Sequence, residues 1–377
     1  MPLDSLKTIG WDIGGANIKA VALCRRKEGS VERKVAVRPF EIWRERKNLP
    51  AALAEIGDAL GAPDTNAMAV TMTAELSDTF LTKREGVLFV FDAMAHAFPR
   101  TPIYPLSLAG DFVQLGEARL RPLDFAASNW VASALYVAIR HPTCILLDVG
   151  STTTDIIPIR DGRIVIRGIT DMERMTSGEL VYSGILRTNP NTIVGEVPID
   201  GRMCRVAAEY FTVMADVYLI LGLISAEAYT CPTPDGRART PGAARERLAR
   251  LVCADVEMLN EEQTLKLARY LFEKQLNQLT DALCKVLSGL ENGYQMPLAV
   301  AGAGTFLAAG AGRRLGITIL DLGREWGEDA VTALPATAAA YLLAQKIEDK
   351  TLSVLFSQRK SKKHNDKKEV ITFKSNV

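Results

Sequence analysis

The N-terminal residues show the hydrophobic pattern of a β-hairpin. An apolar run over 8–13 stops at Gly14 and Gly15, and alternating apolar residues resume over 18–22 before a charged turn at 25–29. Apolar residues at every second position predict a strand with one buried face, and glycines between two such runs predict a tight turn. We therefore expect strand, turn and strand at the start of the chain.

The remainder of the first half predicts a sheet with helices. Short apolar runs bounded by glycine or polar residues are typical of strands, and apolar residues at helical spacing are typical of helices. Strands are expected at 31–37, 67–71 and 102–105, and helices at 51–60 and 125–139. The second helix would connect the first half of the chain to the second half.

An apolar strand over 144–149 repeats the opening of the chain. It ends in Asp-Val-Gly-Ser at 148–151, and the first strand ends in Asp-Ile-Gly-Gly at 12–15, about 136 residues earlier. Asp161-Gly162 then predicts a tight turn into a strand at 164–166. An internal duplication explains this recurrence, so we expect an α/β fold with two related halves.

The rest of the second half reads as mostly helical. The elements expected are helices at 205–223, 243–259, 261–290, 305–311 and 329–347, a proline-rich loop at 230–242 and a strand at 298–301. The halves then cover 1–140 and 141–348. The polar, Lys-rich tail at 349–377 is expected to be disordered rather than a nucleic-acid-binding arm.

Composition excludes several classes of function. The 377 residues include 48% hydrophobic residues, enough for a large core. Because 45 Lys and Arg balance 44 Asp and Glu, no overall charge favours nucleic acid or an anionic membrane. The six cysteines form no Cys-x-x-Cys pair, and no apolar run is long enough to span a membrane. A cytoplasmic protein is the expectation, with a homodimer left open.

The first glycine turn is a candidate phosphate and metal site. Asp12 ends a buried strand, and Gly14 and Gly15 would let backbone N–H groups approach an anion. Asn17 and Lys19 follow in the same motif. The alternative is a plain hairpin in which Asp12 caps the turn. A dinucleotide-binding motif is excluded because a strand, not a helix, follows the glycines.

The second turn carries more chemistry. Asp148 could hold Mg²⁺ through water, and the turn beside it offers a glycine and three hydroxyls to phosphate oxygens: Gly150, Ser151, Thr152 and Thr153. A Thr-rich strand edge is the alternative. Asp155 is either a base or a turn-facing strand residue.

Three further segments complete the candidate site. Gly302, Gly304 and Thr305 form a strand-to-helix turn that could approach a planar or phosphorylated ligand. Glu75 in the segment 71–78 is either a cleft carboxylate or part of a helix capping box. Glu179 lies in a polar segment, 176–184, read as a functional loop rather than a helix cap. With three histidines in the chain, histidine-dependent catalysis is not expected.

The motifs at 11–17, 72–78, 148–155 and 178–184 bring a family into view. The span 8–347 resembles the hydantoinase/oxoprolinase-like branch of the sugar-kinase/actin/heat-shock-ATPase (ASKHA) superfamily. Within it, the four motifs resemble tetrahydromethanopterin-linked C1-transfer pathway proteins, which include a synthase of methanofuran biosynthesis. The resemblance implies a duplicated ribonuclease H-like fold with two halves around a central cleft.

The resemblance also implies a chemistry. The expected enzyme is a transferase that joins an aminomethylfuran-methyl diphosphate to the phenol of γ-glutamyltyramine and releases diphosphate. Asp12 and Asp148 would hold Mg²⁺, the two turns would hold the diphosphate or ATP, and Lys19 would add charge. Glu75, Asp155 or Glu179 would take the phenolic proton, and the sequence does not choose among them.

Three other functions remain open. A small-metabolite kinase would use the same cradle with ATP. An ATP-dependent hydrolase of the hydantoinase or oxoprolinase type is less compatible with the chain length. A non-catalytic actin-like protein is the last alternative.

Overall fold

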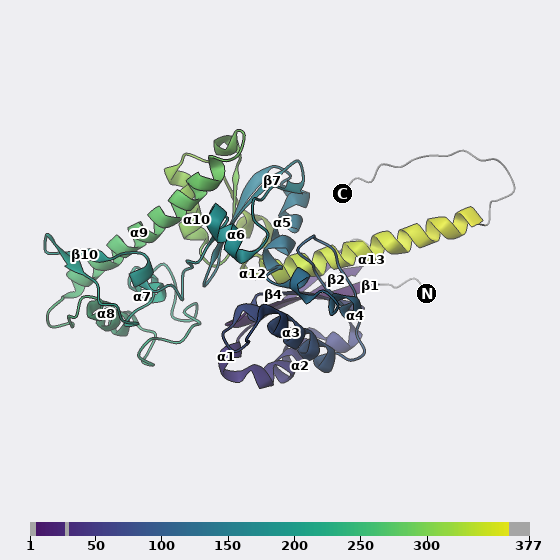
Figure 1. Ribbon diagram of the computed structural model, residues 1–377, viewed down its shortest axis with the longest axis horizontal. Coiled ribbons are helices and arrows are strands. Elements are labelled where there is room, and N and C mark those ends of the chain that lie inside the picture. Colours follow the sequence, from purple (N-terminus) through teal and green to yellow (C-terminus); the bar gives the residue numbers. More distant parts are fainter. Residues whose placement is uncertain (1–4, 27–29, 362–377) are drawn as a thin grey trace. The chain divides into compact units, whose positions relative to one another are not determined.

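The computed structural model describes residues 5–26 and 30–361, with the backbone alone over 350–361. The chain divides into two compact units, Met1–Pro142 with Ala333–Val377, and Thr143–Thr332. Each is an α/β unit built on a mixed sheet (Figure 1).

The first unit contains a five-stranded sheet in the order β3-β2-β1-β4-β5. Its strands are β1 (Ser5–Ile13), β2 (Asn17–Arg26), β3 (Val31–Pro39), β4 (Ala67–Met72) and β5 (Ile103–Pro105). Its principal helices are α2 (Leu49–Leu60), α3 (Lys83–Ala97), α5 (Asn129–Arg140) and α13 (Leu334–Ser361), with short α1 (Ile42–Glu45) and α4 (Leu115–Ala118). The predicted hairpin β1–β2 is confirmed.

Side-chain alternation along β1 explains how this sheet is covered. Ile9, Trp11 and Ile13 point into a core shared with α2 and α3, whereas Leu6 packs with α13. At Gly10 the backbone of α13 comes so close that an added Cβ would lie 2.0 Å from the carbonyl oxygen of Ala336. Asp12 follows Gly10 on the α13 face, because alternate residues of a strand share a face.

The second unit repeats this topology with an insertion. Its strands β6 (Cys144–Val149), β7 (Thr154–Arg160), β8 (Arg163–Ile164), β12 (Leu298–Ala301) and β13 (Ile319–Asp321) lie in the order β13-β12-β6-β7-β8, and β9 (Leu180–Val181) also pairs with β7. In both units a hairpin's first strand pairs in parallel with a later strand, β4 or β12. The duplication is therefore confirmed at the level of topology.

The other elements of the second unit lie mostly between β9 and β12 or after β12. They are α6 (Asp171–Ser177), α7 (Met214–Ile220), α8 (Pro241–Arg250), α9 (Glu261–Leu287), α10 (Thr305–Arg314), α11 (Leu322–Trp326), α12 (Glu328–Thr332) and the hairpin of β10 (Glu196–Ile199) with β11 (Arg202–Arg205). A large core joins α7, α8 and α9 to the strands β6 and β12.

Three predictions about the helices need correction. The helix expected at 205–223 is only α7, because Asp216 accepts a hydrogen bond from the N–H of Val213 and so starts the helix there. The helix expected at 243–259 ends at Arg250, and Cys253 has a left-handed φ of 56°. Helix α3 was not predicted; its N-cap is Thr82, so 71–78 does not open it.

The domain boundaries also differ from the prediction of 141–348 for the second half. Helix α13 packs on β1, β4 and α5, so it belongs to the first unit. The tail expected at 349–377 begins inside α13, which continues to Ser361. Residues 362–377 lie outside the described residues.

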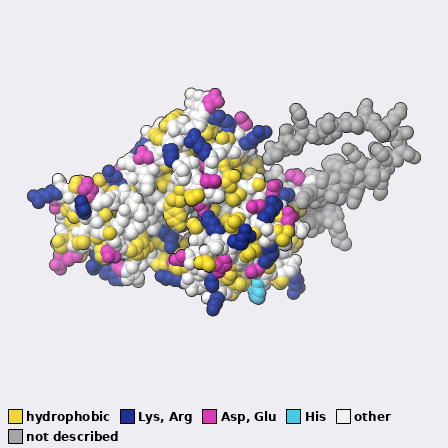
Figure 2. Space-filling model, viewed as in Figure 1, with side chains coloured by type: hydrophobic (Ala, Val, Ile, Leu, Met, Phe, Trp, Pro, Cys, Tyr) yellow, Lys and Arg dark blue, Asp and Glu magenta, His cyan; other side chains and the backbone are white. Residues whose placement is uncertain are grey.

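Surface charge and hydropathy agree with the composition. On the face drawn in Figure 2, basic and acidic side chains are interspersed. Within 5–26 and 30–361, no helix is long and apolar enough to cross a membrane.

The close approach of α13 to β1 yields a stability prediction. Gly10→Ala should lower the free energy of unfolding by about 1 to 3 kcal/mol, because the new methyl group displaces the helix backbone. Gly116→Ala is the matched control, since nothing lies within 4 Å of its Cβ position. Chemical denaturation measures both variants, and equal stabilities would contradict the packing described for α13.

Candidate functional site

The turns of the two hairpins have the same geometry. In the first, the N–H of Gly14 donates to the carbonyl oxygen of Asn17 at 2.9 Å; in the second, the N–H of Gly150 donates to that of Thr153 at 2.8 Å. These residues are 136 positions apart, as are the paired residues of the flanking strands. The turns are therefore equivalent parts of a duplicated unit.

In both turns the carbonyl oxygens accept hydrogen bonds from a neighbouring segment of the chain. Those of Gly15 and Ala16 accept from the N–H groups of Ile42 and Phe40, each at 3.0 Å. Among the backbone hydrogen bonds of the described residues, none is donated by the N–H of Gly15 or Ala16. Successive N–H groups arranged in this way form a concavity that binds anions.

The second turn is tied down in the same way. The carbonyl oxygen of Gly150 accepts a hydrogen bond from the N–H of Ile185 at 3.0 Å. The carbonyl oxygen of Ser151 accepts from the N–H groups of Leu186 and Arg187, each at 3.0 Å. In the described chain, Ser151, Thr152 and Thr153 donate no backbone hydrogen bond. The turn thus presents three N–H groups and three hydroxyls.

Gly184 fixes the second turn from behind. A Cβ at this position would lie 2.5 Å from the Thr152 nitrogen and 2.6 Å from the Gly150 carbonyl oxygen. Gln275 of α9 donates to the Gly184 carbonyl oxygen at 2.9 Å and is itself hydrogen-bonded to the Tyr218 hydroxyl. A buried polar chain from α7 and α9 therefore supports the turn. The role of 176–184 as a loop is partly corrected, since 171–177 is α6.

The acidic residues of the hairpins have different partners. Asp12, 7% exposed, lies opposite Lys19 across β1 and β2, whereas Asp148 lies opposite Asp155 across β6 and β7. Directly opposite residues of an antiparallel pair share a face of the sheet. The first hairpin therefore pairs a carboxylate with a cation, and the second places two carboxylates side by side.

A buried arginine lies beside the second pair. The Arg174 guanidinium contacts Oδ1 of Asp155 at 3.0 Å, and the two side chains are 1% and 14% exposed. Burial raises the pKa of Asp155, Arg174 opposes that shift, and Asp171 adds to it. Sequence reasoning did not single out Arg174, because nothing in its local sequence marks an arginine as buried.

The other predicted carboxylates are held differently. The Glu179 carboxylate accepts from the N–H of Arg167 at 2.7 Å, the N–H of Gly168 at 3.0 Å and the Ser177 hydroxyl at 2.8 Å. Glu75 is 1% exposed and lies in the single turn that follows β4. Of the three predicted bases, Asp155 is the one that lies next to the glycine turn of a hairpin.

The predicted strand-to-helix turn after β12 forms against the second hairpin. Gly302 has a φ of 84°, and a Cβ there would lie 2.4 Å from Oδ1 of Asp148. The N–H of Gly304 donates to the carbonyl oxygen of Val149 at 2.9 Å, and α10 begins at Thr305. The turn therefore brings an N-terminal helix end next to Asp148.

Metal-binding geometry is limited in the described chain. No group of three or more His, Cys, Asp or Glu side chains in it could hold a metal ion. The Mg²⁺ expected at Asp12 and Asp148 stays a prediction. Mg²⁺ commonly keeps several waters and takes one or two carboxylates, so the single carboxylate of Asp148 can serve as a ligand for that ion.

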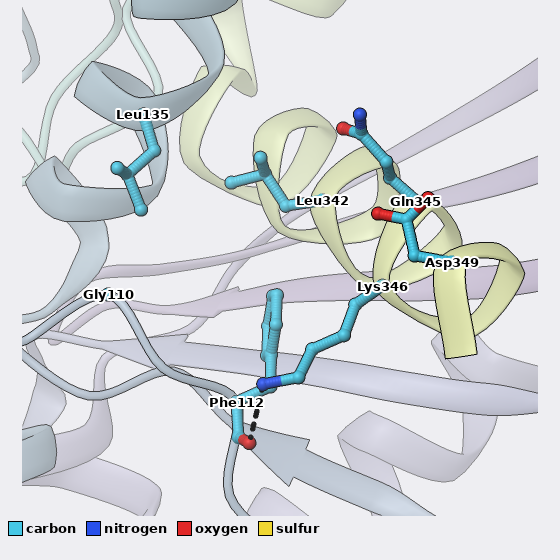
Figure 3. Close-up of a pocket in the computed structure, with 7 residues that line it drawn as sticks. All are labelled: Gly110, Phe112, Leu135, Leu342, Gln345, Lys346 and Asp349. Atoms are coloured by element: carbon cyan, nitrogen blue, oxygen red, sulfur yellow. Dashed lines mark hydrogen bonds between the residues drawn. The ribbon is translucent and has the colours of Figure 1, made fainter. Parts of the chain in front are cut away.

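A pocket of about 500 Å³ occurs elsewhere in the first unit. Its lining residues lie on α5, α13 and the loop before α4: Gly110, Phe112, Leu135, Leu342, Gln345, Lys346 and Asp349 (Figure 3). Lys346 donates to the carbonyl oxygen of Phe112 at 3.2 Å. None of the predicted site residues lines this pocket, so we do not assign it to the site.

Comparison with known proteins identifies the family of the chain. A model of the hydantoinase/oxoprolinase family matches residues 66–346. The chain belongs to this family. It is 34% identical over 342 residues to a protein of Methanocaldococcus jannaschii named (4-{4-[2-(γ-L-glutamylamino)ethyl]phenoxymethyl}furan-2-yl)methanamine synthase, covering 90% of this chain and 98% of that one.

Two further matches agree with the first. A Methanococcus vannielii protein of the same name is 29% identical over 213 residues, which are 55% of this chain and 93% of that protein. Nucleotide-free acetone carboxylase has a similar fold, with a TM-score of 0.53 at 11% identity over 89% of this chain and 70% of that one. At this identity the likeness shows the fold alone, and it agrees with the expected α/β fold of two halves.

The support of the second turn by Gly184 can be tested by binding. Gly184→Ala should weaken the binding of inorganic pyrophosphate about tenfold or more, since the methyl group displaces the N–H of Thr152, and a hydrogen bond to a charged group contributes about 1.5 to 3 kcal/mol. Gly195→Ala, with nothing within 4 Å of its Cβ position, is the control. Calorimetry that gives both variants the same affinity would contradict the assignment.

Proposed function

We propose that the chain is a transferase that forms an aryl ether between an aminomethylfuran and γ-glutamyltyramine, in methanofuran biosynthesis. The observation that carries this proposal is 34% identity to a synthase of that product name across 98% of its length. The name of that product contains a phenoxymethyl link between the furan and the phenyl ring. The bond formed therefore joins a phenol oxygen to the CH₂ attached to the furan.

The proposed reaction balances with diphosphate as leaving group. The phenol oxygen attacks the CH₂, the bond from CH₂ to the diphosphate oxygen breaks, and its electron pair leaves with diphosphate. The phenolic proton passes to a carboxylate and then to water. Because an electron-rich furan stabilises positive charge on the CH₂, the protein's main tasks are to orient the two substrates and to stabilise charge on the diphosphate.

The hairpin turns suit the second task. Ser151, Thr152 and Thr153 would donate backbone and hydroxyl hydrogen bonds to diphosphate oxygens, and Gly14 and Gly15 form the equivalent turn of the first unit. Asp148 would hold Mg²⁺, with Asp12 as its counterpart in the first unit. When bound, that ion would neutralise charge on the leaving diphosphate.

Asp155 is the carboxylate we propose as acceptor of the phenolic proton. Its Oδ1 contacts Arg174, and its side chain is 14% exposed. Glu179 accepts three hydrogen bonds from its own loop and is better suited to holding that loop. Glu75 is almost fully buried.

The proposed function predicts an ether product without ATP. The wild-type chain, Mg²⁺, γ-glutamyltyramine and the aminomethylfuran-methyl diphosphate should yield the ether and free pyrophosphate, as followed by mass spectrometry. Asp148→Asn should lower the rate about 100-fold or more, because the variant loses a carboxylate ligand of Mg²⁺. The positive charge that stabilises the leaving diphosphate is then weakened.

Two results would contradict this proposal. Absence of ether, with ADP formed from ATP and a phosphorylated acceptor, would instead support a small-metabolite kinase. Full activity of Asp148→Asn would remove the role assigned to the second hairpin. Asp161→Asn, at an exposed turn on the same sheet, is the matched control and should retain activity.

A further inference from the structure

Helix α6 is a short, firmly anchored element between β8 and β9. At its start, the Thr170 hydroxyl accepts from the N–H of Glu173, and the Glu173 carboxylate accepts from the N–H of Thr170 at 3.0 Å. At its end, Gly178 adopts a left-handed φ of 86°. Both ends of the helix are thus fixed by local hydrogen bonds and backbone geometry.

Neighbouring segments hold α6 in place. The Glu179 carboxylate spans the N–H groups that precede the helix and the Ser177 hydroxyl at its end. Lys285 of α9 donates to the carbonyl oxygen of Thr176 at 2.6 Å. At Gly168 an added Cβ would lie 2.6 Å from the backbone nitrogen of Arg174, so the chain before α6 packs directly on the helix.

The one fully buried side chain among the described residues of α6 is Arg174. Its Nη2 donates to the carbonyl oxygen of Glu179 at 3.1 Å, and its Nη1 contacts Oδ1 of Asp155 at 3.0 Å. A buried guanidinium is costly unless it is paired, and its planar fork fixes the partner's orientation. The anchored helix therefore places the Arg174 guanidinium in a fixed position against Oδ1 of Asp155.

The two hairpins differ in the charge of the residue opposite the first aspartate. In the first unit the residue opposite Asp12 is Lys19, so the hairpin contains its own cation. In the second unit the equivalent residue is Asp155, and two carboxylates stand opposite each other. Like charges directly opposite on a sheet are destabilising. Arg174 supplies a positive charge to Asp155 from outside the hairpin.

We propose that Arg174 is a positioning residue for the transfer reaction: by holding Oδ1 of Asp155, it directs Oδ2 toward the phenol hydroxyl. This inference rests on the proposed function, in which Asp155 contacts the phenol. Arg174 itself contacts Asp155 and the backbone of Glu179. Its effect is therefore on the orientation of Asp155 rather than on substrate affinity.

The test separates kcat from KM. Arg174→Met should lower kcat about 100-fold, because misplacing a reacting group by about 1 Å costs about that much, while the KM for both substrates stays close to the wild-type value. Arg174→Lys should recover part of the loss, since a lysine keeps the charge without the fork. Guanidinium ion added to Arg174→Ala should raise kcat and leave the wild-type enzyme unchanged.

A matched control distinguishes positioning from stability. Arg247 is also a fully buried arginine, paired with Asp216 within 2.6 Å, and no part of it is assigned to the site. Arg247→Lys should lower the melting temperature and leave kcat unchanged. If Arg247→Lys loses kcat as Arg174→Lys does, or if folded Arg174→Met keeps full kcat, the positioning role is overturned.

Failure of the proposed function gives a different pattern. If the wild-type chain makes no ether from the two substrates, the transferase proposal fails and takes the role of Arg174 with it. If the wild-type chain is active but guanidinium ion does not raise the kcat of a folded Arg174→Ala variant, only the role of Arg174 fails.

Discussion

A single backbone hydrogen bond closes each hairpin turn, from Gly14 to Asn17 and from Gly150 to Thr153, and the N–H groups that each turn presents depend on its own bond. Each bond sets a turn in which carbonyl oxygens are held from behind and N–H groups are left for an anion. The surrounding structure serves this constraint. Segments at 40–42 and 185–187 hold the carbonyl oxygens, and glycines provide the close packing that a side chain would prevent.

Duplication supplies the two turns, but the charges around them have diverged. Asp12 stands opposite Lys19, and Asp148 stands opposite Asp155 with Arg174 of α6 behind it. A symmetric pair of hairpins thus becomes an asymmetric pair of sites. The second unit gains a carboxylate that the first lacks, which is the group an ether-forming transferase needs for the phenolic proton.

The hairpins were predictable because glycine turns and period-two alternation are local signals. The recurrence of Asp-x-Gly across 136 residues indicated the duplication, and the strand-to-helix turn at Gly302 was predicted correctly. The start of α7 was not, because its cap depends on the Asp216 carboxylate reaching back to Val213. Arg174 and the assignment of α13 to the first unit depend on tertiary packing, which no local pattern contains.

Labelling of the phenol oxygen tests most directly whether diphosphate is the leaving group of the reaction. γ-Glutamyltyramine carrying oxygen-18 in its hydroxyl would be incubated with the aminomethylfuran-methyl diphosphate and the wild-type chain. If diphosphate leaves from the CH₂, mass spectrometry should find the label in the ether, with unlabelled pyrophosphate. Label in a phosphate ester of the tyramine, with no labelled ether, would show attack at phosphorus and contradict that role.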